Sequence, residues 1–282
     1  MALPEEFEIE EFIRRVLAED LGTDGDVTSI ATIGPDARFT AEMNCRQVIV
    51  VAGLDLAAAF FGALDPDVQI EQLANDGDRA EHGRTLLRLV GNARAMLSAE
   101  RSALNTVQHL SGIATLTRQY VDAISGTRAR LLDTRKTIPG LRLLEKYAAR
   151  MGGAHNHRMR LDDGVLIKDN HVAVCGGVAE AVRRAKAADT GLEVQIEVDR
   201  IEQIEPALSA GADRLLLDNM DPAMLREAVK LVAGRVPLEA SGGVTLETIR
   251  FLAETGVDYI SVGRITQSAP AVDIGLDYAV SR

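Results

Sequence analysis

The sequence predicts a small α+β domain followed by a (β/α) barrel. In the first part of the chain, strand-like runs follow one another with little helix between them, which favours a mostly antiparallel sheet. From about residue 130, strand-like runs alternate with amphipathic helices and short loops, which indicates a parallel sheet. At least six strand–helix units occur in a row, so we expect a (β/α) barrel, which could have fewer than eight units. An open doubly wound sheet is the alternative, although no GxGxxG follows the first strand of the run.

The first domain opens with an amphipathic helix in "EEFIRRVLAEDLG", which Gly22 ends. The stretch "LDLAAAFFGAL" predicts a second helix, and a long helix is expected over roughly 93–124, with Gly112 as a candidate break. The strands of this domain are expected at 38–43, 46–53, 67–73 and 83–91.

Barrel strands are expected at 129–133, 164–169, 193–199, 212–218, 236–242 and 257–263. We therefore divide the chain into an N-terminal domain, residues 1–112, and a barrel, residues 113–267. Residues 268–282 are expected to return to the first domain.

Composition narrows the functional classes. Hydrophobic residues make up 46% of the chain, enough for a large core, while the formal net charge is −11. An acidic protein is not expected to bind nucleic acid, because phosphate backbones are bound by basic surfaces. No run approaches the roughly 20 apolar residues of a membrane span. The acidic start resembles no signal peptide, and two distant cysteines suggest no disulfide framework, so we expect a cytoplasmic protein.

Polar side chains follow each predicted barrel strand. In parallel α/β folds the active site lies at the carboxyl ends of the strands, so these side chains are candidates for one site. They are Thr134, Arg135 and Lys136 after the first strand, Lys168 after the second, Glu197 in the third and Asp218 in the fourth. The segment "GGAHNHRMRLDDG" adds His157, Arg158 and Arg160. Clustered cations repel one another unless an anion compensates them, so we expect a small polyanionic ligand.

Glycine-rich loops follow the last two strands, where barrels often bind a phosphate through backbone N–H groups. They contribute Ser241, Gly242 and Gly243, and then Gly263. The acidic residues could hold ribose hydroxyls, or a Mg²⁺ that in turn holds a diphosphate.

Plainer interpretations stay open for some of these residues. Arg135 and Lys136 could be a solvated helix start. The three histidines at 155, 157 and 171 could suggest zinc, but no cysteine is near and His-x-His in a loop is a weak pattern.

Several motifs make the sequence similar to a known family. "EDLGTDGDVTS", "ERSALNTVQHLSGIAT", "DTRKTIPGLRLLEKYA", "GGAHNHRMRLDDGVLIKDNHV" and "EASGGV" resemble quinolinate phosphoribosyltransferase, also called carboxylating nicotinate-nucleotide pyrophosphorylase. The likeness runs from about residue 19 to 278. It implies an N-terminal open-sandwich domain and a C-terminal α/β barrel short of eight units. It also implies transfer of phosphoribosyl from phosphoribosyl diphosphate to quinolinate with decarboxylation, giving nicotinate mononucleotide, CO₂ and diphosphate in NAD biosynthesis.

The resemblance further implies roles for the candidate residues. Mg²⁺ would accompany the diphosphate substrate, and no organic cofactor is expected. The protein would form a homodimer with a shared active site, with a hexamer left open. Arg101 would reach quinolinate across the interface. Arg135, Arg158 and Lys168, with His157 and Thr134 nearby, would bind the quinolinate carboxylates; Lys136, Glu197 and Asp218 would act on the phosphoribosyl diphosphate and its Mg²⁺; Ser241, Gly242, Gly243 and Gly263 would bind the 5-phosphate.

Two positions depart from the family pattern. Arg264 stands where the family often has a small residue, and Gln267 where it often has histidine. Three other functions remain open: a sister barrel class associated with molybdenum transport genes, a non-catalytic phosphate sensor, and a generic ribulose-phosphate-binding barrel enzyme. The intact "IKDNH" and "NHR" motifs favour the quinolinate enzyme over the first.

Overall fold

The computed structural model describes residues 3–4 and 6–279. Its contacts divide the chain into two compact units. Unit 1 contains Met1–Thr117, Leu143–Gly152 and Ser268–Arg282, and unit 2 contains Arg118–Arg142 and Gly153–Gln267. Residues 1, 2 and 5 of the expected N-terminal domain, and 280–282 of the expected returning segment, lie outside the described residues.

Unit 1 is built on a four-stranded antiparallel sheet of order β12-β1-β5-β3. The pleat buries alternate residues of β1, such as Ala41, Met43 and Cys45. Helix α1 buries Phe12, which packs edge-on against Phe60 of α3 at 6.1 Å between ring centres. The elements are α1 (Ile9–Leu21), α2 (Val27–Thr32), β1 (Arg38–Cys45), β2 (Ile49–Val50), α3 (Leu54–Leu64), β3 (Gln69–Gln72), β4 (Arg79–Ala80), β5 (Thr85–Asn92), α4 (Ala93–Ala123), α5 (Arg142–Gly152) and β12 (Ile274–Tyr278).

Two local predictions in this unit are wrong. Helix α4 runs through Gly112 without a break. A side chain at Gly112 would meet the Pro270 carbonyl and the Ala271 Cα, the latter at 3.1 Å, so the glycine permits a close approach of the C-terminal segment. The strand expected over 46–53 shrinks to β2, because the backbone amides of Ala52 and Gly53 bond to side chains of Ser111 and Asp76.

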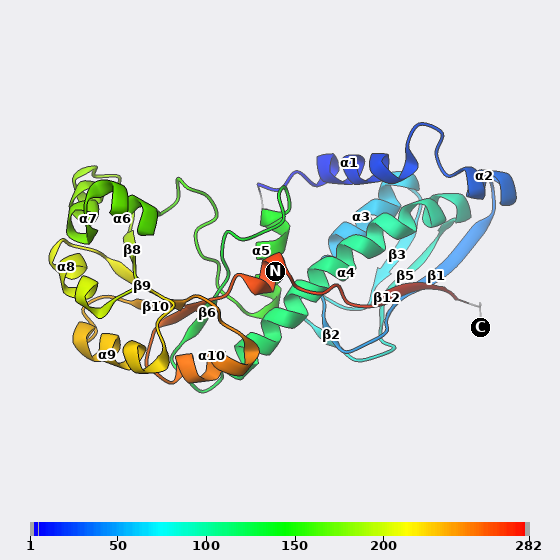
Figure 1. The fold of residues 1–282 in the computed structure, drawn as a ribbon. Helices are drawn as coiled ribbons and strands as arrows, with labels where there is room; N and C mark the ends of the chain where they lie inside the picture. The colour runs from blue at the N-terminus through cyan, green and yellow to red at the C-terminus, as the bar shows by residue number, and fades with distance from the viewer. Residues whose placement is uncertain (1–2, 5, 280–282) are drawn as a thin grey trace. The chain divides into compact units, whose positions relative to one another are not determined.

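Unit 2 is an incomplete parallel β/α barrel, as predicted. Its six strands have the order β6-β11-β10-β9-β8-β7, so the first and last strands along the chain pair with each other. No ladder joins β6 to β7 among the described strands. Figure 1 shows helices α7 to α10 lying outside these strands. The strands are β6 (Arg130–Leu132), β7 (Val165–Ile167), β8 (Val194–Val198), β9 (Arg214–Asp218), β10 (Leu238–Ser241) and β11 (Tyr259–Ser261).

Helices α7 to α10 of unit 2 each bury apolar residues on one face, whereas α6 and η1 bury none. For example, α9 buries Leu225, Ala228 and Val232, and Asp221 caps its first turn by accepting from two backbone N–H groups. The helices of unit 2 are α6 (Asp169–Cys175), α7 (Val178–Ala187), η1 (Ile201–Gln203), α8 (Ile204–Ser209), α9 (Pro222–Val232), α10 (Leu246–Ala253) and α11 (Arg264–Gln267). Within the described residues, no helix is both long and apolar enough to cross a membrane.

Candidate active site

A cavity of about 690 Å³ lies in unit 2, where the strand ends meet. Every predicted site residue except Arg101 and Arg160 lines it: Thr134, Arg135, Lys136, His157, Arg158, Lys168, Glu197, Asp218, Ser241, Gly242, Gly243 and Gly263. The guanidinium of residue 135 and the ammonium of residue 168 therefore share one hollow, which the hypothesis of an anionic ligand requires. Arg101 lies on α4 in unit 1 with its side chain 59% exposed.

One side of the cavity is cationic. Arg158 is half-buried and donates from Nη1 to the carbonyl oxygen of Gly164 at 2.9 Å. Burial, and then the charge of Arg135, lower the pKa of the Arg158 guanidinium. The Nε of Arg135 is buried without a hydrogen-bond acceptor in the described part of the chain. Both observations describe cations that an anionic ligand would stabilise.

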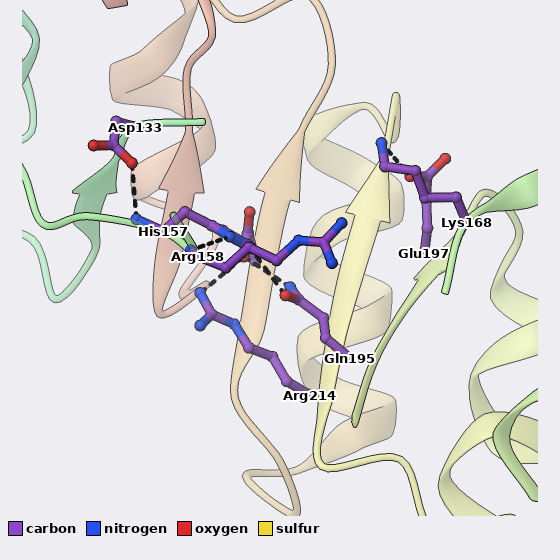
Figure 2. Close-up of polar contacts among 8 residues, drawn as sticks. Asp133, His157, Arg158, Lys168, Gln195, Glu197 and Arg214 are labelled. Carbon is purple, nitrogen blue, oxygen red and sulfur yellow. Dashed lines mark hydrogen bonds and ion pairs between the residues drawn. The ribbon is translucent and has the colours of Figure 1, made fainter. Parts of the chain in front are cut away.

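Two carboxylates also line the cavity, one of them beside Lys168. Glu197 and Asp218 lie near the ends of the neighbouring strands β8 and β9, and Lys168 Nζ lies 3.5 Å from Glu197 Oε2 (Figure 2). Burial raises the pKa of Glu197, although Lys168 opposes the shift, and burial likewise raises the pKa of Asp218. A group of three or more His, Cys, Asp or Glu that could hold a metal is absent from the described residues. Two carboxylates fit a Mg²⁺ that completes its coordination with substrate phosphates and water.

The third side is made of the loops after β10 and β11. Gly242 has φ +97°, a conformation that suits glycine, and a Cβ there would lie 2.9 Å from the backbone N of Asn219. Asn219 bonds through its N–H to the Ser241 carbonyl at 2.9 Å and donates its amide to Asp218 at 2.6 Å. Asn219 was not predicted as a site residue, and it links the glycine loop to the acidic side.

The gap between β6 and β7 explains how the "NHR" segment reaches the cavity. His155 forms an isolated parallel bridge with Leu132, and its N–H bonds to the Leu131 carbonyl at 2.9 Å. The segment thus takes the place of a barrel strand for one residue. Buried Asp133 then accepts from the backbone N–H of His157 at 2.8 Å (Figure 2). These bonds direct residues 156–158 toward the cavity.

A buried polar network, whose member Glu239 lines the cavity, escaped the sequence analysis. Gln195, Arg214 and Glu239 come from the adjacent strands β8, β9 and β10. Gln195 donates to Glu239 at 2.8 Å, and Arg214 Nη2 lies 2.8 Å from the same carboxylate. A single amide or charge inside an otherwise apolar strand, as in "EVQIEV" and "VPLEAS", is the signal that could have identified them.

Other predicted polar residues have structural partners. Arg160 was expected in the cationic cluster but does not line this cavity, and its Nε bonds to Asp162 at 3.0 Å. The ring of His171 accepts from the Lys168 N–H at 3.0 Å, which caps the start of α6. Arg264 and Gln267, the two departures from the family pattern, both line the cavity.

Comparison with known proteins identifies a family. The family model for the C-terminal domain of quinolinate phosphoribosyl transferase matches residues 113–277, and the N-terminal domain model matches residues 26–111. The nicotinate-nucleotide pyrophosphorylase [carboxylating] of Mycobacterium leprae is 44% identical over 272 residues, covering 94% of this chain and 95% of the relative. A probable enzyme of that name from Bacillus subtilis is 41% identical, covering 97% and 94%.

Solved structures lead to the same family. That of the nicotinate-nucleotide pyrophosphorylase from Francisella tularensis has a TM-score of 0.92 and 41% identity, covering 96% of each chain. The corresponding protein from Ehrlichia chaffeensis gives a TM-score of 0.93 at 41% identity, covering 97% of this chain and all of the other. With both domain models matched in order along one chain, this protein belongs to the quinolinate phosphoribosyltransferase family.

Proposed function

We propose that this protein transfers phosphoribosyl from phosphoribosyl diphosphate to quinolinate with loss of CO₂, giving nicotinate mononucleotide and diphosphate for NAD biosynthesis. The observation that carries the proposal is the cavity that combines three chemically distinct sides: Arg135, Arg158 and Lys168 on one, Glu197 and Asp218 on another, and the glycine loops on the third. A pyridine dicarboxylate needs the first, a sugar diphosphate with Mg²⁺ needs the second, and a 5-phosphate needs the third.

Positioning supplies much of the rate acceleration in this scheme. Guanidinium groups bind carboxylates through paired hydrogen bonds, and the Lys168 ammonium adds a point charge. The pyridine nitrogen then faces C1 of the ribose. It forms a bond to C1 as the bond from C1 to the diphosphate oxygen breaks, and diphosphate leaves with the electron pair.

Positive charge develops on the ribose in that step, and the carboxylates of Glu197 and Asp218 stabilise it. Mg²⁺ would neutralise the leaving diphosphate. Lys136, after the first barrel strand, faces the phosphoribosyl diphosphate. The 5-phosphate is held by Ser241, Gly242, Gly243 and Gly263. After transfer the ring nitrogen is cationic. It accepts the electron pair left when the adjacent carboxylate departs as CO₂, and the ring carbon takes up a proton.

The direct test is an assay of the purified full chain with quinolinate, phosphoribosyl diphosphate and Mg²⁺, following nicotinate mononucleotide by chromatography. Nicotinate in place of quinolinate should give little product, because it lacks the second carboxylate that the cationic side binds. Equal turnover with nicotinate, or none with quinolinate, would contradict the proposal.

Two arginines in one segment provide a matched pair of variants. Arg158→Met removes a cation from the cavity, and Arg160→Met removes an exposed cation two residues away. We expect Arg158→Met to lower kcat/KM for quinolinate by at least about thirtyfold, since truncating one partner of a desolvated charge pair costs roughly 2–5 kcal/mol. Arg160→Met should stay within about threefold of the parent protein, as surface substitutions usually do.

We further propose a homodimer in which Arg101 of the partner subunit binds quinolinate. The exposed position of Arg101 on α4, outside the cavity that holds the other cations, supports this arrangement. Subunit mixing tests it: Arg101→Met and Lys168→Met homodimers should both have strongly reduced activity. After random exchange of their subunits, about a quarter of the sites should regain activity, because a mixed dimer holds one intact site. No recovery on verified exchange would refute the shared site.

A cytoplasmic location remains a prediction from the sequence, and the choice between a dimer and a hexamer stays open. Both cysteines, Cys45 and Cys175, are free, which agrees with a reducing compartment. The printed names of plant relatives place those proteins in mitochondria or chloroplasts.

A further inference from the structure

The buried network of Gln195, Arg214 and Glu239 requires an explanation beyond the fold. Glu239 is fully buried, and Gln195 is 5% exposed. A well-packed apolar interior is usually as stable as a buried ion pair or more so, because taking charges out of water costs more than their attraction returns. The structure therefore gives no stability reason for these residues. Glu239 lines the cavity, and His157 Nε2 lies 3.2 Å from the Gln195 amide oxygen (Figure 2).

A series of hydrogen bonds links the Arg158 backbone N–H to Glu239 through His157 and Gln195, and each group donates toward Glu239. An ionised carboxylate only accepts, so the Gln195 amide must turn its NH₂ toward Glu239, at 2.8 Å. The amide oxygen then faces His157 Nε2 at 3.2 Å, and it can only accept, so Nε2 carries the ring proton. His157 Nδ1 is left as an acceptor, and it receives the backbone N–H of Arg158 at 2.7 Å.

The Glu239 carboxylate, on which this series of hydrogen bonds depends, stays ionised. Burial by itself raises the pKa of Glu239, but hydrogen bonds to the carboxylate and the charge of Arg214, whose Nη2 lies 2.8 Å away, outweigh it, and the pKa lies below its ordinary value. Arg214 stabilises the Glu239 carboxylate by its charge and not by an aligned hydrogen bond, although its Nη2 lies 2.8 Å from the carboxylate. The Arg214 guanidinium also stacks on Tyr259, 4.1 Å from the ring centre.

This arrangement uses both ring nitrogens of His157. Neither is left to donate a proton to a substrate carboxylate. The side chain instead holds the Arg158 backbone from one side, while Asp133 accepts the His157 N–H at 2.8 Å from the other. Two buried carboxylates thus fix a segment whose guanidinium is both desolvated and repelled by Arg135.

We propose that Glu239 is a positioning residue for quinolinate: through Gln195 it sets the neutral Nε2–H form of His157 and thereby fixes Arg158 for the carboxylate before substrate arrives. The proposal rests on the proposed function, and it replaces the predicted direct contact of His157 with quinolinate by an indirect role. Preorganising a binding group in this way lowers the entropy lost when the substrate binds.

Substitutions that change hydrogen-bond direction test the proposal. In Glu239→Gln the amide can donate or accept, so Gln195 can rotate, His157 can take the Nδ1–H form, and the Arg158 N–H loses its acceptor. We expect KM for quinolinate to rise roughly ten- to a hundredfold, the range caused by small misplacements of a binding group, while KM for phosphoribosyl diphosphate changes by less than about threefold. Glu205→Gln, which breaks an exposed pair with Arg235, is the control for loss of one carboxylate.

Exchanging the two side chains separates direction from stability. In the double variant Gln195→Glu with Glu239→Gln, the carboxylate faces His157 directly and only accepts, so the Nε2–H form is specified again. The buried net charge is unchanged, but Arg214 now faces an amide. If the direction of these hydrogen bonds sets the His157 tautomer, the KM for quinolinate should return to within about threefold of the parent value. A double variant as impaired as Glu239→Gln would overturn the proposal.

Nitrogen-15 NMR of histidine-labelled parent protein gives a measurement that does not depend on any variant folding. His157 should show an unprotonated Nδ1 and a protonated Nε2 at neutral pH, with its signals assigned by their loss in His157→Asn. A protonated Nδ1 would refute the mechanism while leaving the enzyme activity intact. Failure of the parent protein to turn over quinolinate would instead refute the proposed function.

Discussion

Gly242 allows the most detailed prediction, because its neighbour Gly243 provides a matched control. Both residues have positive φ, +97° and +58°. A Cβ at Gly242 would lie 2.6 Å from Asn219 Cγ and 2.9 Å from its backbone N, whereas a Cβ at Gly243 meets nothing within 4 Å. Alanine at either position carries backbone strain, but only alanine at 242 must also displace Asn219.

The magnitude follows from two contributions. An L-residue forced into the left-handed region costs about 1–2 kcal/mol. Displacing Asn219 also breaks its charge-assisted bond to Asp218, worth about 1.5–3 kcal/mol. The sum for Gly242→Ala is about 2.5–5 kcal/mol, and its lower end corresponds to roughly a sixtyfold loss in kcat/KM for phosphoribosyl diphosphate. Gly243→Ala carries only the first contribution.

Steady-state kinetics with varied phosphoribosyl diphosphate measures this difference, and calorimetric titration with quinolinate tests its selectivity. Gly242→Ala should be at least about tenfold worse than Gly243→Ala, since the displaced bond is worth at least about 1.5 kcal/mol. Quinolinate binding should be nearly unchanged in both. Two variants with equal kinetics would show that the Asn219 contact does not position the phosphate loop.

Three further outcomes are expected. Lys168→Met should weaken quinolinate binding by about 2 kcal/mol, roughly thirtyfold, because the ammonium is half-exposed; titration calorimetry measures it, and a change below about threefold would contradict the assigned role. Asp218→Asn should abolish turnover yet stabilise the fold near neutral pH: a carboxylate whose folded pKa is raised contributes stability at low pH that is lost as pH rises through that pKa. Urea unfolding should show this gain at pH 7 and its disappearance in acid, and a destabilised variant at pH 7 would refute it. Tyr147→Phe should cost about 1.5–3 kcal/mol of unfolding free energy, because the phenol donates to Asp76 at 2.6 Å, while kcat stays unchanged; a melting point equal to the parent's would contradict this.

The pH dependence of activity follows from the same acidic side. Glu197 and Asp218 both have raised pKa values, so activity should fall on acidification at a higher pH than for ordinary carboxylates, near 4. Because Lys168 lowers the pKa of Glu197, the acid limb of kcat should move to still higher pH in Lys168→Met. A pH–rate profile of the residual activity measures the shift, and a limb that moves to lower pH would contradict the assignment.

Local sequence patterns were sufficient for much of the fold. The helix expected from "LDLAAAFFGAL" is α3, residue for residue. Each predicted barrel strand contains an observed strand, since apolar runs bounded by polar turns are a local signal. Because the carboxyl ends of parallel strands lie at one edge of a sheet, the cations, carboxylates and glycine loops could be assigned to one predicted site. Gly112 shows the limit, because the C-terminal segment that requires a glycine there is more than 150 residues away.

The sequence by itself determined the order of strands and helices and the charge at each strand end. Only the tertiary structure decided which side chains face the barrel interior. The pairing of β6 with β11, the missing ladder between β6 and β7, and the entry of residues 155–158 at that gap bring Asp133, His157, Gln195 and Glu239 together. The physical reason is that a strand's inward face depends on pleat register and sheet closure, and a shift of one residue would exchange the two faces.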